Sequence, residues 1–156
     1  REYIGELNRE MFAEASGENL DNATHSELLD AILYSSFPNF QVWIGYHGNI
    51  VYQFRPNGDD HETCIFEMMY LTPFSGERPP PAEVVHLGVD DPWTDATGLE
   101  KLAMVAEQDT FNMEQVHRGL KNLRRDGVAL SRYQESTVRW KHDLLGEYID
   151  RGPVGS

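Results

Sequence analysis

The sequence is poor in cysteine, in basic residues and in long apolar runs. Its single cysteine, Cys64, excludes an internal disulfide and favours a cytoplasmic location. No apolar run approaches the length that spans a bilayer, and no signal peptide is visible. Because 26 acidic residues face only 13 basic ones, the net charge is −13, and we expect neither nucleic acid nor a membrane surface as a partner.

What is present indicates a globular protein. A chain of 156 residues with 40% hydrophobic residues is long enough to bury a core and predicts one domain. We place this domain at residues 1–150 and a flexible tail at 151–156. Cys64 lies in a strand-like run and is interpreted as a small core residue.

Local patterns predict helices near both ends and strands between them. Residues 1–14 form a helix that Ser16-Gly17 ends, and Thr24 with Glu27 is a capping box for a second helix through Leu33 to about Ser36. Runs at 40–46, 50–55 and 63–72 predict a three-stranded antiparallel meander with turns at 47–49 and 56–59. A short edge strand is expected at 84–87, and a last helix follows Glu135 to about Ile149.

The central feature is an amphipathic helix over residues 99–120. Its apolar positions recur at steps of three and four and are Leu99, Leu102, Val105, Ala106, Met113, Val116 and Leu120. Asp109 lies on this apolar stripe, three residues after Ala106 and four before Met113. Burying an unpaired charge is very costly, so this carboxylate needs an explanation.

Three interpretations of Asp109 fit the pattern. The helix ends or kinks there and the side chain is solvated, or the carboxylate pairs with an arginine, or it binds a metal ion. Candidate arginines are Arg118, Arg124 and Arg125. From the pattern alone the metal is the minority interpretation, because structural ion pairs more often perturb a carboxylate.

Several short motifs carry a resemblance to a known family. They are, in chain order, Phe37-Pro38-Asn39, Trp43-Ile44, Phe54-Arg55-Pro56, Glu107-Gln108-Asp109, Asn112-Met113-Glu114, Val116-His117-Arg118-Gly119-Leu120 and Glu135. Their order and spacing from about Ser26 to Ile149 resemble the C-terminal catalytic domain of the alpha subunit of Rieske-type ring-hydroxylating oxygenases. The family often has Gln where His117 stands.

The resemblance implies a fold and a cofactor. The fold is α+β, a START-like helix-grip arrangement in which an antiparallel sheet wraps a long helix, here incomplete, with a hydrophobic cavity between sheet and helix. The cofactor is mononuclear non-haem Fe(II) held by two His and one carboxylate, which leaves positions open for O₂. The carboxylate corresponds to Asp109, so the metal interpretation becomes the favoured one.

The histidines depart from the family pattern. The family has two closely spaced His ligands upstream of Phe37-Pro38-Asn39, whereas only His25 precedes that motif here. The two Cys-His pairs that hold a 2Fe-2S cluster are also absent, since Cys64 is alone. Three explanations fit: a piece cut from a longer chain, a shortened gene product, or a relative that has lost the chemistry. In each case we expect the chain alone to be inactive and to bind Fe(II) poorly.

The resemblance also implies a substrate and partners. An aromatic substrate would contact Leu33, Trp43, Leu99, Leu102 and Val105, each of which could equally be plain core. O₂ is the co-substrate, the intact enzyme takes electrons from a ferredoxin or reductase, and a homo-oligomer is compatible with this assignment. The alternative function is a metal-free helix-grip module that binds a hydrophobic small molecule.

Overall fold

The computed structural model of the chain describes residues 1–46 and 49–152. The chain divides into two compact units, unit 1 at Arg1–His86 and unit 2 at Leu87–Ser156, and each is described by itself. The predicted turn at His47-Gly48 and the part of the predicted tail at 153–156 lie outside the described residues.

Unit 1 begins with two helices whose ends follow the sequence signals. Helix α1 (Glu2–Ser16) ends at Gly17, which has φ +73° and donates its backbone N–H to the Ala13 carbonyl. Helix α2 (His25–Leu29) begins with the expected capping box, because the Thr24 hydroxyl accepts from the Glu27 N–H at 3.3 Å and the Glu27 carboxylate accepts from the Thr24 N–H at 2.7 Å. Both predictions are confirmed.

The prediction of a longer second helix is wrong. Asp30 follows α2 in an extended conformation, and strand β1 (Ile32–Ser36) takes up the residues that were expected to continue the helix, Leu33 among them. The reason is non-local: the strand pairs antiparallel with β2 (Phe40–Ile44), and Leu33 lies opposite Trp43. Hydrogen bonds to a neighbouring strand outweigh a weak local preference for helix.

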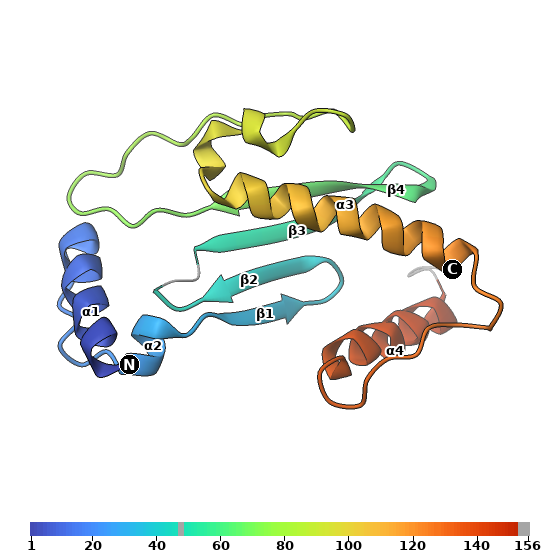
Figure 1. Cartoon of the computed structure of the whole chain (residues 1–156), viewed down its shortest axis with the longest axis horizontal. Helices are drawn as coiled ribbons and strands as arrows, with labels where there is room; N and C mark the ends of the chain where they lie inside the picture. Colours follow the sequence, from blue (N-terminus) through green and yellow to red (C-terminus); the bar gives the residue numbers. More distant parts are fainter. Residues whose placement is uncertain (47–48, 153–156) are drawn as a thin grey trace. The chain divides into compact units, whose positions relative to one another are not determined.

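The sheet therefore has four strands instead of three. Strands β3 (Ile50–Asn57) and β4 (Asp60–Tyr70) continue it in the order β1-β2-β3-β4, with every neighbouring pair antiparallel. Figure 1 shows the four strands side by side in chain order. The expected edge strand at 84–87 is not formed: in the described part of the chain these residues belong to no helix or strand and have no pairing partner.

The core of unit 1 lies beside the helices. Phe12, Leu20 and Leu28 are buried together, and the Phe12 ring stacks on Tyr46 with centroids 5.4 Å apart. Cys64, expected in the core, is exposed, which corrects that interpretation. It pairs with Pro56 near the end of the β3-β4 hairpin, where its neighbours Thr63 and Ile65 are exposed as well, so this end of the hairpin is solvated.

Unit 2 contains two long helices, and two short 3-10 turns precede the first of them. The turns η1 (Trp93–Asp95) and η2 (Thr97–Leu99) are 3-10 helices that lead into α3 (Leu102–Lys121), and α4 (Ser136–Arg151) follows. The central helix begins three residues later than predicted, because Glu100 has φ +49° and interrupts the helical path. The last helix agrees with its prediction and extends to Arg151.

Taken by class, the chain is α+β with an antiparallel sheet, as predicted. The sheet is open rather than closed, and this architecture is consistent with an incomplete helix-grip fold. Among the described residues, no helix combines the length and the hydropathy needed to cross a bilayer.

Candidate functional site

One side of α3 borders an open hollow of about 480 Å³ that contains the predicted metal ligand. The side chains that line it recur at helical spacing and are Asp109, Asn112, Met113, Val116, His117 and Leu120. Three of them are apolar, and the others offer a carboxylate, an amide and an imidazole. The structure thus places Asp109 on the apolar stripe, in the middle of a continuous helix.

Asp109 is exposed and makes no ion pair among the described residues. Of the three candidate arginines, Arg118 is engaged with Glu114 at 3.4 Å, one helical turn apart. The helix does not end at Asp109, because α3 runs unbroken from Leu102 to Lys121, but the exposed side chain agrees with the interpretation that Asp109 is solvated. Its carboxylate is therefore available to a ligand that enters the hollow.

The neighbouring face of α3 binds the preceding turn η1 through hydrogen bonds that the sequence did not reveal. The Trp93 backbone N–H donates to the Glu107 carboxylate at 2.8 Å, and the Trp93 indole N–H donates to the Thr110 hydroxyl at 3.2 Å. These bonds attach η1 to α3 over 14 and 17 residues of sequence, a separation at which no local pattern signals a contact. Glu107 thus fixes a turn, while Asp109, two residues on, faces the hollow.

The five residues predicted to contact substrate fall into two groups. Leu33 and Trp43 lie opposite each other in unit 1, where Leu33 is 41% exposed and Trp43 is half-buried. Leu99, Leu102 and Val105 belong to unit 2: Leu99 is buried in η2, Leu102 is half-buried, and Val105 is 46% exposed one turn before Asp109. Each group lies within one unit.

The metal-binding side chains of the described residues fall short of a complete Fe(II) site. A facial site needs two His and one carboxylate in one cluster. Within residues 1–46 and 49–152, no three side chains of His, Cys, Asp or Glu gather into a group that could hold a metal ion. The described residues do not fit a complete iron site, and Asp109 supplies one ligand at most.

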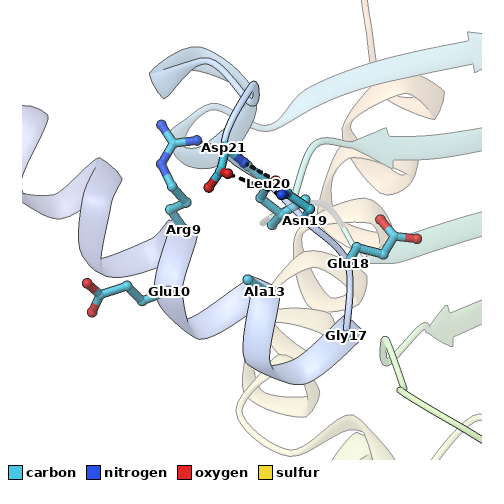
Figure 2. A pocket seen from close by; sticks show the side chains of 8 residues that line it. All are labelled: Arg9, Glu10, Ala13, Gly17, Glu18, Asn19, Leu20 and Asp21. Atoms are coloured by element: carbon cyan, nitrogen blue, oxygen red, sulfur yellow. Dashed lines mark hydrogen bonds between the residues drawn. The ribbon is translucent and has the colours of Figure 1, made fainter.

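A second hollow, of about 450 Å³, lies beside the end of α1 in unit 1 (Figure 2). Three of its polar side chains are engaged: Arg9 donates to the Leu20 carbonyl and to Glu6, and Asn19 and Asp21 bond to each other at 2.8 and 3.1 Å. The bond from Arg9 to Leu20 holds the loop 17–23 against α1, so we assign this hollow to the packing of unit 1.

An antiparallel α+β fold and a long helix that presents a carboxylate beside apolar side chains are consistent with the class of ring-hydroxylating catalytic domains that the motifs resemble. The family model described as ring hydroxylating alpha subunit (catalytic domain) matches residues 5–151, so the chain belongs to this family. The resemblance is confirmed, and the family makes the chain part of a ring-hydroxylating oxidoreductase. No curated protein and no solved structure matches the chain.

Proposed function

We propose that this chain is part of the catalytic domain of an oxygenase that uses mononuclear non-haem Fe(II) and O₂ to hydroxylate a hydrophobic aromatic substrate. The observation that carries the proposal is the family match over residues 5–151, together with an Asp109 that has no ion pair among the described residues and lies beside apolar side chains of the hollow. The chain by itself is inactive, because the described residues provide no complete ligand set. We place the enzyme in the cytoplasm, with a 2Fe-2S cluster and a ferredoxin or reductase as its source of electrons.

In this proposal Asp109 supplies the carboxylate ligand, and the two His ligands come from outside these 156 residues. A carboxylate on a long rigid helix is well suited to that task, because a ligand must be held within a few tenths of an ångström of its productive position. The iron, when bound, supplies the activation of O₂. The residues of this chain hold the carboxylate and shape the apolar surface beside it.

The substrate contacts proposed are Leu33, Trp43, Leu99, Leu102 and Val105. Val105 is the best placed of them, since it is 46% exposed and lies one helical turn from Asp109. Leu99 has the least surface to offer, because it is already buried at 8% exposure. Aliphatic and aromatic side chains of this kind favour an uncharged ring compound.

A second candidate function is a metal-free module that binds a hydrophobic small molecule. The observation that favours it is the hollow on α3, where Met113, Val116 and Leu120 provide apolar surface without a set of metal ligands. The two candidates differ in whether Asp109 is needed, since an apolar ligand gains nothing from a carboxylate.

The test uses the full-length protein that contains this sequence, supplied with Fe(II), a reductase and a panel of aromatic hydrocarbons. We expect Asp109→Ala to abolish formation of hydroxylated product, and Asp143→Ala, a matched exposed carboxylate on α4, to leave it unchanged. Val105→Phe should shift the preference toward smaller rings. Equal formation of product by wild type and Asp109→Ala would refute the role of Asp109 as an iron ligand. Hydrocarbon binding without turnover in either protein would refute the oxygenase proposal and support the metal-free module.

A further inference from the structure

A buried donor without a partner lies on the sheet of unit 1. The indole Nε1 of Trp43 is shielded from solvent and, within the described residues, has no hydrogen-bond acceptor. Trp93 shows the usual arrangement, because its indole N–H donates to the Thr110 hydroxyl at 3.2 Å. A buried N–H costs free energy unless something accepts its proton, so the exception at Trp43 calls for an acceptor.

The surroundings of Trp43 on the sheet are aromatic and aliphatic. Strand alternation and register place it on the same face as Leu33, which lies directly opposite, and as Tyr52, whose partner Gln41 is two residues before Trp43. Along that face, Phe54 and Phe66 stack with centroids 4.6 Å apart, and Tyr52 contacts Phe66 at 5.7 Å. Such a face suits a planar aromatic ring, since ring pairs attract one another beyond simple burial.

The chemistry of the indole group restricts what the missing acceptor can be. An indole N–H only donates, so its partner has to carry a lone pair, and in a small organic molecule that atom is most simply oxygen. Trp43 itself is half-buried, so one edge of the ring borders accessible space while Nε1 is covered. A ligand that lies along this face brings an oxygen to the donor when it displaces the atoms that shield Nε1.

We infer that the Trp43 indole N–H is a specificity determinant that selects aromatic substrates bearing a hydrogen-bond-accepting oxygen over plain hydrocarbons. This inference rests on the proposed function, in which Trp43 contacts the substrate. It narrows the substrate class from a hydrophobic ring to an oxygen-substituted ring. A site that is built to donate a hydrogen bond discriminates against an analogue without the acceptor, because the donor is then left unpaired.

The test compares two ligands of the same shape on the full-length protein. Acetophenone carries a carbonyl oxygen where α-methylstyrene carries a CH₂ group. We expect wild type to bind acetophenone about five- to tenfold more tightly, the ratio that one net hydrogen bond provides. Trp43→Phe should lose the preference, so that the variant binds the two ligands with affinities within about twofold of each other. Trp140→Phe, which alters an exposed indole on α4, should retain it.

A measurement on wild type keeps the inference testable if Trp43→Phe fails to fold. With ¹⁵N label confined to residues 1–156, which hold three tryptophans, the indole ¹H–¹⁵N signal of Trp43 can be assigned through Trp93→Phe and Trp140→Phe and by elimination. The Trp43 signal should move downfield with acetophenone and stay in place with α-methylstyrene. The same shift with both ligands, or no preference for acetophenone in wild type, would overturn the inference while leaving the proposed function intact. If wild type binds neither acetophenone nor α-methylstyrene, the result would count against the proposed function as well.

Discussion

In unit 1, Phe12, Leu20 and Leu28 form a core that two capped helices and a loop enclose, whereas in unit 2 the buried residues are mainly small. Ala96, Leu99, Ala103 and Ala106 are buried where η1 and η2 meet α3. Many larger apolar residues of unit 2 stay at least 40% exposed, among them Phe111, Val116, Leu120, Trp140 and Leu145. Unit 1 thus buries large apolar side chains in its core, whereas unit 2 buries mainly alanines. Both units leave many other apolar side chains exposed, and Tyr3, Ile4 and Ile32 of unit 1 are among them.

Among the substitutions that test this comparison, we expect the largest loss of stability at Leu28, which is fully buried. We expect Leu28→Ala to lower the free energy of unfolding by about 2–5 kcal/mol, because it deletes a core side chain and leaves a cavity. Leu120→Ala, at a leucine of α3 that is 43% exposed, should cost less than about 1 kcal/mol. Urea denaturation measures both, and equal losses would show that the two units are not stabilised differently.

Two adjacent residues of α3 have different expected roles: Thr110 stabilises unit 2, and Asp109 serves the proposed function. Thr110→Val removes the acceptor of the Trp93 indole and should lower the free energy of unfolding by about 1 kcal/mol. Asp109→Ala removes an exposed side chain without a partner in the described residues, so its cost should stay within about 0.5 kcal/mol. If Asp109→Ala and Asp109→Asn both unfold the protein, the carboxylate has a structural partner and the functional assignment is wrong.

The smallest expected effect is a pH dependence in unit 1. Arg55 donates two hydrogen bonds to Glu67, at 2.6 and 2.8 Å, and this holds the pKa of the Glu67 carboxyl below its ordinary value of 4.5. A lowered folded-state pKa stabilises the protein above pH 4.5, and that contribution is lost as the pH falls through the folded-state value. Glu67→Gln should therefore lower the urea midpoint slightly at pH 7 and leave it unchanged at pH 2.

The control for this pair is Glu77→Gln, an exposed carboxylate in the segment after the sheet. Because the Arg55–Glu67 pair is exposed on both sides, added salt should shrink the effect of Glu67→Gln at pH 7. An effect of Glu67→Gln that persists at pH 2 would mean that the side chain stabilises unit 1 through packing rather than charge.

The elements that sequence reasoning found are those with local signals. The capping box at Thr24, the stop at Gly17 and the stripe that carries Asp109 depend on residues three to four apart, and all three are present. Strand β1 was missed because pairing with β2 determines its conformation. The bonds from Trp93 to α3 were missed for the same reason, since they join residues 14 and 17 apart.

The residues of the candidate site show the same difference between local signals, which the sequence reveals, and contacts between distant residues, which it does not. The spacing of Asp109, Met113 and Val116 predicts that they share one face of a helix. All three line the hollow on α3, so this prediction is confirmed. Leu33 was assigned to a helix and lies in a strand, so its pairing with Trp43 could not be anticipated. The role of each residue toward substrate or iron stays a prediction, because it depends on groups that these residues do not supply.

Iron content of the purified full-length protein tests the central claim most directly. After loading with Fe(II) and removal of free metal, we predict about one mononuclear iron per wild-type chain, in addition to the cluster iron, and none at that site in Asp109→Ala, with Asp143→Ala equal to wild type. Residues 1–156 alone should retain none. Stoichiometric iron in Asp109→Ala, or Asp109-dependent iron in residues 1–156 alone, would contradict the account.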